Sequence, residues 1–377
     1  MTDLVAGSHA WSRLGPEHYT EESFVDAERA RVFSPAWQPV GLVKELENDR
    51  DFLCVEVAGH SVVIQNFRGV LRAFENVCSH RQSPIRTCAR GNGPLQCPYH
   101  GWTYDEEGRV VGIPQRKSFG HLSSDVLQQL TLDAWGLEVV GPLVFVCRKP
   151  TRGGLQQALG ELGSELTPLL QRAQRCLDRG SFELACNWKV MLENGLDAYH
   201  VPLVHADTIH KHGLHELSRE RHGEHSAGRF VAASGARVLR ALRYAFPGAD
   251  ISDRYTHYLL FPNVYVVSVY DLFLVVSRMD PRRADLTQFE SFVFVTWDGD
   301  AGNVALREEL NASNAAFFRN GYQEDKQICE HVQRRLRHTH RRALLGAEEE
   351  RIPMFHQAWL ERMALDLQIN PEPREQP

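Results

Sequence analysis

Short apolar runs alternate with polar turns along residues 36–147. Runs that are rich in β-branched and aromatic residues, and that are broken by Gly or by an Asp-Arg-Asp triplet, are typical of β-strands. We expect strands at residues 37–43, 52–57, 61–66 and 70–74, with a further β-rich run at 137–147. A Lys-Pro pair and a Gly-Gly pair follow within residues 149–154 and indicate a boundary. The pattern therefore predicts a small β-domain at residues 36–150.

The pattern becomes helical directly after this boundary. Four leucines recur at helical spacing, namely Leu155, Leu159, Leu162 and Leu166. Pro168 should restart the helix with Thr167 as its N-cap, and the apolar pattern continues to Leu177. Near the N-terminus, Thr20 and the acidic residues after it predict a capped helix.

Strand patterns return in the second half of the chain. They fall at residues 181–186, 230–233, 255–261, 264–270, 272–279 and 288–297. Their close spacing favours an antiparallel sheet. Two long helical patterns follow, at 303–342 and 347–367. The prediction is an α+β fold in which residues 1–35 and 151–377 form a larger domain, a large antiparallel sheet covered by helices.

Composition narrows the class of protein only a little. The chain has 377 residues and a net charge of −6, so it carries no broad signal for nucleic-acid binding. No apolar run approaches the roughly 18 residues that a membrane helix needs. The N-terminus lacks a basic-then-apolar leader, and we expect a cytoplasmic protein that does not associate with membranes. Of the eight cysteines, six show no spacing typical of disulfides and are expected to be reduced.

Two short Cys–His clusters lie on one long loop. The first is Cys78-Ser-His80, and the second is Cys97-Pro-Tyr-His100. A Rieske [2Fe–2S] cluster needs two Cys on one iron and two His on the other. A structural zinc site is the alternative, but zinc sites with these ligands usually pair Cys with Cys and His with His. Because each cluster of residues here is mixed, the order favours a Rieske centre.

Residues 76–81, 97–105 and 108–114 resemble the Rieske domain of non-haem iron aromatic-ring-hydroxylating oxygenases, in their alpha (terminal oxygenase) subunits. Tyr99 excludes the extra disulfide of respiratory Rieske proteins. Trp102 stands where those proteins place a hydroxyl donor, so we expect a potential low in the range of roughly −150 to +300 mV. Gln82 departs from the family, which usually has Gly there.

A second metal-binding pattern follows in residues 187–205. A helix is expected from Asn187 through His200, which puts Asp197 and His200 on one face. Pro202 should stop this helix, so that the chain turns and brings His205 back to the same ion. The spacing D-x-x-H-x-x-x-x-H resembles the segment that supplies two ligands to mononuclear iron in the same oxygenases. By that resemblance, His200 and His205 are iron ligands.

The third ligand should be a carboxylate, which would complete a 2-His-1-carboxylate triad. On the long C-terminal helix, Phe318, Ile328, Val332 and Leu336 form an apolar stripe. Asp325 falls within that stripe, whereas Glu324 and Glu330 fall off it. An unpaired carboxylate on a core-facing stripe costs several kcal/mol, and a metal removes that cost. The segment 323–330 also resembles the family's segment around its ligand Asp, so we assign Asp325; the alternative is an acid paired with an Arg.

The resemblance also implies how the two metal sites work together. In the family, an acid that matches Asp197 links an iron-ligand His to a cluster-ligand His of the neighbouring subunit. This implies a homotrimer in which Asp197 connects His200 or His205 to the neighbour's His100; an ordinary carboxylate that orients one imidazole is the alternative. The implied catalytic domain is helix-grip-like. The implied cofactors are a [2Fe–2S] cluster, mononuclear Fe(II) and O₂, with NAD(P)H electrons arriving through a separate reductase, with or without a ferredoxin.

The reaction is predicted as hydroxylation or oxidative demethylation of a small organic substrate. The spacing from Asn194 to Asp197 is similar to that of the monooxygenases acting on quaternary ammonium compounds, and it is one residue shorter than in naphthalene-type dioxygenases. A cis-dihydroxylating aromatic-ring dioxygenase is the alternative. A non-catalytic Rieske electron carrier is a more remote alternative, and intact His200, His205 and Asp325 argue against it.

Four weaker predictions remain. Neutral or apolar residues near the iron by sequence are candidates for the substrate pocket, namely Met191, Asn194, Val201, Val204, Phe261, Asn263, Tyr265, Asn314 and Phe318. Five histidines after the ligands are expected in a loop over the active-site mouth: His210, His212, His215, His222 and His225. The basic segment 333–342 is expected to be a solvated helix end, and docking of a reductase is its alternative. Trp102 and Tyr104 are expected to serve packing.

Overall fold

The computed structural model describes residues 11–120, 122–233, 235–297 and 299–364. The chain forms two compact units. One comprises Met1–Phe33 and Leu159–Pro377, and the other comprises Ser34–Ala158. Each unit is built around its own antiparallel sheet. Within the described residues, no helix is long and apolar enough to cross a membrane.

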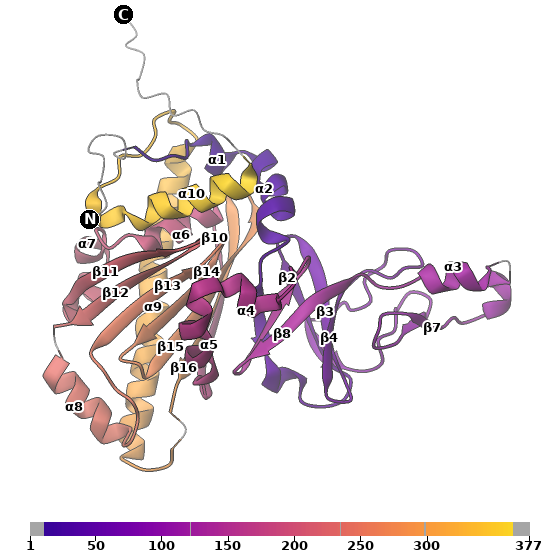
Figure 1. Cartoon of the computed structure of the whole chain (residues 1–377), viewed down its shortest axis with the longest axis horizontal. Coiled ribbons are helices and arrows are strands. Elements are labelled where there is room, and N and C mark those ends of the chain that lie inside the picture. The colour runs from indigo at the N-terminus through magenta and orange to yellow at the C-terminus, as the bar shows by residue number, and fades with distance from the viewer. Residues whose placement is uncertain (1–10, 121, 234, 298, 365–377) are drawn as a thin grey trace, which may run out of the picture. The chain divides into compact units, whose positions relative to one another are not determined.

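The smaller unit contains a seven-stranded sheet in the order β1-β9-β8-β4-β3-β2-β5 (Figure 1). Its strands are β1 (Gln38–Leu42), β2 (Asp51–Val57), β3 (His60–Phe67), β4 (Val70–Glu75), β5 (Arg90–Asn92), β8 (Ala134–Val140) and β9 (Leu143–Cys147). The β-rich run expected at 137–147 is confirmed as a hairpin of β8 and β9, in which Gly141, with φ +56°, and Pro142 make the turn. A short ribbon of β6 (Thr103–Tyr104) and β7 (Val110–Gly112) and a helix α3 (Ser124–Gln129) complete the unit.

The two candidate cluster loops lie over one of two hydrophobic cores in this unit. One core consists mainly of aliphatic residues of the sheet strands, such as Val40, Val62 and Ile64. The other joins Phe52 and Phe74 of the sheet to the loop cysteines and to the aromatic residues that follow them. The loops are therefore held against a packed aromatic surface.

The larger unit contains a second seven-stranded antiparallel sheet, in the order β10-β16-β15-β14-β13-β12-β11. Its strands are β10 (Arg175–Leu184), β11 (Leu214–His222), β12 (His225–Ala232), β13 (Arg254–Leu260), β14 (Val264–Val269), β15 (Phe273–Arg283) and β16 (Leu286–Val295). Figure 1 shows the long helix α9 (Val304–Leu336) running along this sheet, where it contacts α6 (Trp188–Leu196) and β10. The predicted α+β class, with an antiparallel sheet covered by helices, is confirmed.

Seven further α-helices are described outside the two sheets. They are α1 (Glu17–Thr20), α2 (Glu22–Glu28), α4 (Gly154–Leu159), α5 (Gly163–Gln171), α7 (Val201–Val204), α8 (Gly235–Ala245) and α10 (Arg351–Met363). The Glu28 carboxylate joins α2 to α6 and α10: Lys189 of α6 bonds Glu28 of α2, and both side chains are fully buried. The indole N–H groups of Trp188 and Trp359 donate to the same carboxylate over 2.7 and 2.8 Å. Removing one partner of such a pair costs about 3–5 kcal/mol.

Several predicted element boundaries are wrong. Pro168 does not restart a helix but lies inside α5, where a proline removes one backbone hydrogen bond. The helical pattern does not continue to Leu177, because β10 already begins at Arg175. Helix α9 ends at Leu336 instead of 342, since His338, Thr339 and His340 are weak helix formers. Helix α10 begins at Arg351, after a short 3₁₀ turn, and the expected end at 367 lies outside the described residues.

Candidate active site and metal centres

The two Cys–His loops have the same backbone construction. The Gln82 N–H donates to the Cys78 carbonyl over 2.9 Å, and the Gly101 N–H donates to the Cys97 carbonyl over 2.9 Å. Both closing residues have left-handed backbones, with φ of +58° for Gln82 and +72° for Gly101. Gln82 therefore occupies a conformation that favours glycine, at a cost of roughly 1–2 kcal/mol. The departure from the family at this position changes the strain of the loop while preserving its shape.

The four candidate cluster ligands converge. Cys78 and Cys97 are almost fully buried, and the rings of His80 and His100 lie 4.7 Å apart. His80 stacks on Trp102 with a 4.6 Å centroid separation, so Trp102 packs directly against a ligand. The Nδ1 atom of His80 is buried without a hydrogen-bond partner. An orphaned imidazole nitrogen beside two buried thiols fits a metal-bound group, so these residues fit a Rieske cluster.

Tyr104 also contacts a candidate cluster ligand, which the expectation of simple packing overlooked. Its hydroxyl lies 3.0 Å from the Cys78 sulfur, and the Ser79 N–H donates to it over 3.1 Å. Burial and the contact with Cys78 raise the pKa of Tyr104, so the hydroxyl keeps its proton to donate. The environment of the Cys78 sulfur therefore contains a hydroxyl donor, although Trp102 supplies none.

The backbone around the second centre differs from the predicted helix. Asn187 caps α6, since its side chain accepts from the Lys189 N–H over 3.0 Å. The helix ends at Leu196, and Asp197 is extended with φ −98° and ψ 132°. Asp197 and His200 therefore do not share a helical face. Pro202 does not stop the helix but lies in the first turn of the next one, α7, where its missing N–H needs no partner. His205 follows Val204 as the C-cap of α7.

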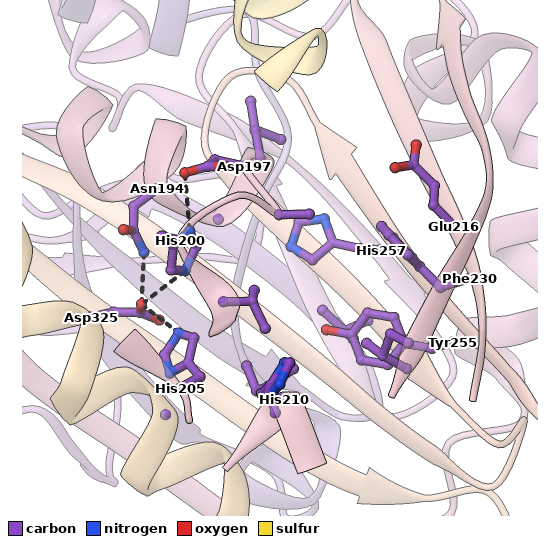
Figure 2. A pocket seen from close by; sticks show the side chains of 18 of the residues that line it. Asn194, Asp197, His200, His205, His210, Glu216, Phe230, Tyr255, His257 and Asp325 are labelled. Carbon is purple, nitrogen blue, oxygen red and sulfur yellow. Dashed lines mark hydrogen bonds and ion pairs between the residues drawn. The ribbon is translucent and has the colours of Figure 1, made fainter. Parts of the chain in front are cut away.

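His200, His205 and Asp325 meet around one point. Each offers a ligand atom, and these atoms lie within 4.8 Å of one another. The Asp325 Oδ1 atom is 2.9 Å from Nε2 of His205 and 3.7 Å from Nε2 of His200 (Figure 2). Two imidazoles and a carboxylate that face one another are the donor set of a 2-His-1-carboxylate iron site. The residues therefore fit the implied metal.

Carboxylates hold the other nitrogen of each imidazole. Nδ1 of His200 is 3.1 Å from Asp197 Oδ2, and Nδ1 of His205 is 2.7 Å from Glu324 Oε2. A carboxylate at Nδ1 holds the proton there and leaves Nε2 free for a metal. The amide of Asn194 in turn donates to Asp325 Oδ1 over 2.7 Å. Each of the three candidate ligands thus has a partner that orients it.

Asp325 is buried on α9, but not on the stripe that the sequence predicted. Ile328 is 39% exposed and Val332 is 45% exposed, so those two residues lie outside the buried face. The buried row instead contains Asn311, Ala315, Phe318, Gly321, Asp325, Cys329 and Gln333. Small and polar residues predominate in this row, which is why hydrophobicity alone located it poorly. The alternative of a pair with Arg is wrong, since the partners of Asp325 in the described chain are Asn194 and the two histidines.

Glu324 is a functional candidate that sequence reasoning missed. It falls off the apolar stripe, yet its carboxylate bonds both His205 and the Thr208 hydroxyl, each over 2.7 Å. The available signal was chemical rather than periodic. A metal-binding imidazole needs an acceptor for its other nitrogen, and Glu324 is the acid adjacent to the assigned ligand.

A cavity of about 520 Å³ opens onto the candidate iron ligands. Five of the nine predicted pocket residues line it: Met191, Asn194, Val201, Tyr265 and Phe318. The other four lie elsewhere. Asn314 lines a second cavity of about 150 Å³, Asn263 donates to the Met279 carbonyl, Phe261 packs toward Phe355, and Val204 lies on α7. Sequence proximity to the candidate ligands suggested a place near the iron for these four residues, but none of them is among the residues that line the larger cavity.

The expected histidine loop is largely a strand. His215 and His222 lie on β11, and His225 lies at the start of β12, where it accepts from the Phe261 N–H over 3.0 Å. His210 and His212 lie on a 3₁₀ turn, and His210 and His215 line the cavity. The loop assignment was wrong because β11 is polar along most of its length.

In the basic segment 333–342, Nη2 of Arg337 forms an ion pair with Oδ2 of Asp285 over 2.5 Å.

Gly195 allows a close approach between α6 and the sheet. A Cβ atom at this position would lie 2.5 Å from the Tyr265 hydroxyl and 2.6–2.7 Å from its ring carbons. That hydroxyl donates to the Leu192 carbonyl, so the ring is held in place. The helix that presents Asn194 therefore rests directly on the floor of the cavity.

Comparison with known families agrees with this geometry. Residues 36–131 match the Rieske [2Fe-2S] domain, and residues 171–365 match the catalytic domain of the ring hydroxylating alpha subunit. The chain belongs to the ring hydroxylating alpha-subunit family. The resemblance inferred from the metal-binding motifs is thus confirmed.

Curated relatives of this alpha subunit include oxygenases that are each named for a different substrate. It is 28% identical over 340 residues to choline monooxygenase of Arabidopsis thaliana, an alignment that covers 84% of this chain and 75% of that protein. It is 27% identical over 200 residues to the carnitine monooxygenase oxygenase subunit of Escherichia coli, covering 52% of each. It is also 26% identical over 206 residues to the anthranilate 1,2-dioxygenase large subunit of Acinetobacter baylyi, covering 52% of this chain and 43% of that protein.

Solved structures share its fold. The quaternary ammonium Rieske monooxygenase CntA in complex with L-carnitine matches with a TM-score of 0.74 and 20% identity, over 94% of this chain and 96% of that one. Naphthalene 1,2-dioxygenase with indole bound matches with a TM-score of 0.73 and 17% identity, over 96% of this chain and 94% of that one.

The enzyme class follows from these relatives. They are named as oxygenase subunits of monooxygenases and dioxygenases, so this alpha subunit is an oxidoreductase that incorporates O₂ into a small substrate. Its family implies a Rieske [2Fe–2S] cluster and mononuclear iron as cofactors, and the two donor sets described above fit both. The predictions of enzyme class and of cofactors are confirmed.

Proposed function

We propose that this alpha subunit is a monooxygenase component that hydroxylates or oxidatively demethylates a small organic substrate, with electrons from NAD(P)H delivered by a separate reductase. The observation that carries the proposal is the meeting of His200, His205 and Asp325 at the wall of the 520 Å³ cavity. A substrate in the cavity would lie beside the open coordination positions at which iron of this ligand type takes O₂.

The chain's own residues would prepare this reaction. Asn194 holds Asp325, while Asp197 and Glu324 hold the Nδ1 protons of the two imidazoles, so each candidate ligand faces the metal position before a substrate arrives. The aromatic residues Phe230, Tyr255 and Phe318 line the cavity and would exclude water around an apolar part of the substrate.

Monooxygenation is preferred over cis-dihydroxylation for two reasons. The spacing from Asn194 to Asp197 resembles the quaternary ammonium branch, and relatives named for choline, carnitine and glycine betaine are monooxygenases. The relative named for anthranilate is a dioxygenase, so cis-dihydroxylation stays the alternative. Turnover under ¹⁸O₂ separates the two, because a cis-diol that carries two labelled oxygens would contradict monooxygenation.

We further infer that Asp197 connects the two metal centres across a subunit interface of a homotrimer. Its carboxylate already bonds His200, and its side chain is only 14% exposed. Tyr199 and Leu203 beside it are 69% and 87% exposed, and Tyr99 beside the exposed His100 is 54% exposed. Exposed large apolar side chains next to both centres are typical of protein–protein contacts. Inter-subunit electron transfer is described for CntA, whose fold this chain shares.

Substitution of Asp197 by Asn tests this connection. We expect the mononuclear iron and the [2Fe–2S] cluster both to be retained while substrate-dependent turnover falls by on the order of 100-fold, because the neutral amide links two imidazoles poorly. Rapid-mixing spectroscopy should show that the reduced cluster reoxidises more slowly. Asp207→Asn, an exposed position nearby, is the matched control. Near-normal turnover of Asp197→Asn, or a fully active monomer, would contradict the proposal.

A further inference from the structure

Arg351 is a buried cation at the wall of the candidate active-site cavity. It begins α10, its side chain is 3% exposed, and it lines the cavity with His257 and Tyr255. Its Nε and Nη2 atoms donate to the Ser226 hydroxyl over 3.2 and 3.1 Å, and Nη2 also donates to the Ser226 carbonyl over 3.2 Å. Nη1 donates to Nδ1 of His257 over 3.1 Å. All of these partners are neutral.

The other fully buried cations of the larger unit have carboxylate partners, and Arg351 does not. Lys189 pairs with Glu28, and Arg278 pairs with Glu290 over 2.6 Å. Within the described residues, no carboxylate lies within 4 Å of the Arg351 guanidinium. Burying a charge without a counter-charge is costly, so proteins rarely do so without a reason. Burial lowers the pKa of Arg351 to about 10, which still leaves it charged near neutral pH.

The acids around the cavity are engaged elsewhere. Glu216 pairs with Arg219, Asp197 bonds His200, and Asp325 bonds Asn194 and the two histidines. Glu348, which also lines the cavity, is exposed. Glu216 acts on Arg351 at longer range, and its partner Arg219 opposes that effect. Arg351 therefore has no carboxylate in direct contact within the described residues, and a negative group that enters the cavity could supply one.

His257 extends this charge into the cavity. A guanidinium can only donate, so Nδ1 of His257 accepts and the ring proton resides on Nε2. Burial, together with the charge of Arg351, lowers the pKa of His257 well below its usual value and keeps the ring neutral. No protein group in the described part of the chain bonds Nε2, and none bonds the Tyr255 hydroxyl. Figure 2 shows both rings across the cavity from the candidate iron ligands.

We propose that this wall binds a carboxylate of the substrate. His257 donates from Nε2, Tyr255 donates from its hydroxyl, and Arg351 supplies the compensating charge behind them. The substrate class is therefore a small organic acid, whose remaining part extends toward His200, His205 and Asp325. The inference rests on the proposed function for the place of oxidation, but the binding of the carboxylate can be measured without turnover.

The test compares carboxylates with uncharged partners of nearly the same shape. The probes are carnitine with its methyl ester, glycine betaine with its amide, and benzoate with benzamide. Calorimetry on the holoenzyme, reduced and kept anaerobic, measures binding alone. We expect at least one acid to bind about 10- to 100-fold more tightly than its uncharged partner, as hydrogen bonds to a charged group predict. Arg351→Met should remove most of this preference, and Arg351→Lys should restore part of it.

Two further variants keep the inference testable if Arg351→Met does not fold. His257→Asn and Tyr255→Phe should each weaken acid binding less than Arg351→Met does, while retaining the spectrum of the cluster. Arg335→Met, on an exposed part of α9, is the matched control and should bind as the native enzyme does. If no acid binds more tightly than its uncharged partner, or if Arg351→Met and His257→Asn both keep the preference, the inference is wrong.

A second assay, of O₂ consumption with the same probes, separates this inference from the proposed function. Acid-selective binding without substrate-dependent O₂ consumption, once a surrogate reductase reduces the cluster, would support the carboxylate site and contradict the monooxygenase proposal. Rapid turnover of neutral or cationic probes with no preference for acids would support the monooxygenase proposal and contradict the carboxylate site.

Discussion

The two candidate metal centres are built in opposite ways. The four cluster ligands fall within residues 78–100 on two loops of matching backbone geometry. The iron ligands come from two segments far apart in sequence, since Asn194 bonds Asp325 across 131 residues and His205 bonds Glu324 across 119. The first centre depends mainly on local turns, whereas the second exists only after α9 has packed against α6. The larger sequence separation at the second centre therefore means that more of the chain must fold before its residues meet.

The imidazoles of the two centres also differ in the nitrogen that they leave free. At the cluster site, Nδ1 of His80 is buried without a partner. At the iron site, Nδ1 of His200 and of His205 is bonded to a carboxylate, and the Nε2 atoms face the common point. The iron site thus surrounds its ligands with negative charge. At the cluster site, a ligand sulfur meets a neutral hydroxyl instead.

The strongest test of this difference between the two centres is to remove one centre and keep the other. Asp325→Ala should abolish binding of the mononuclear iron, so that two of three irons per chain remain and the reduced cluster keeps its spin-resonance signal. Turnover should fall by at least about 1,000-fold, because the metal accounts for several kcal/mol of the chemistry. Iron analysis and O₂ consumption measure both effects.

Glu309→Ala, at an exposed position of the same helix, is the control for that substitution and should retain all three irons. Loss of the cluster signal in Asp325→Ala would show that the two centres depend on each other for assembly. Full iron content with normal turnover would remove Asp325 from the ligand set.

Glu324→Gln should have a smaller effect, and one confined to the iron centre. Removing the negative charge behind His205 should lower iron affinity and turnover by about 10- to 100-fold, as is usual for groups that orient a metal ligand. Chelator competition gives the affinity. Thr208→Val, which removes the other hydrogen bond to Glu324, should change it less. A Glu324→Gln enzyme with unaltered iron affinity would show that this carboxylate serves folding only.

The smallest effect is expected at the cluster. Tyr104→Phe removes the hydroxyl that lies 3.0 Å from the Cys78 sulfur. A hydrogen bond of about 1 kcal/mol corresponds to roughly 40 mV for one electron, and its loss should lower the reduction potential by that amount. A redox titration followed by spin resonance measures it. Tyr99→Phe, whose ring is largely exposed, should leave the potential unchanged. An unshifted potential in Tyr104→Phe would mean that the hydroxyl donates elsewhere.

The sequence predicts the fold class well because strand patterns and metal-binding motifs are both local. Spacing and the family resemblance together point to the four candidate cluster ligands and the two candidate iron-site histidines, and the structure brings the residues of each set close to one another. Prediction fails where tertiary contacts decide. A periodicity argument excludes Glu324, and the polar strand β11 resembles a loop because its side chains lack a hydrophobic alternation. Pro168 and Pro202 both look like breaks in the sequence, although each lies within a helix.

Gly195 limits how this enzyme could be adapted to larger molecules. Because no side chain fits between that residue and Tyr265, variation on α6 would displace the segment that holds Asn194 before it enlarged the chamber. Glu216 of β11 and Phe230 of β12 also line the chamber, away from Asn194 in Figure 2, and both carry large side chains that smaller ones could replace. Laboratory evolution toward bulkier compounds should therefore accumulate replacements on those two strands and leave residue 195 untouched.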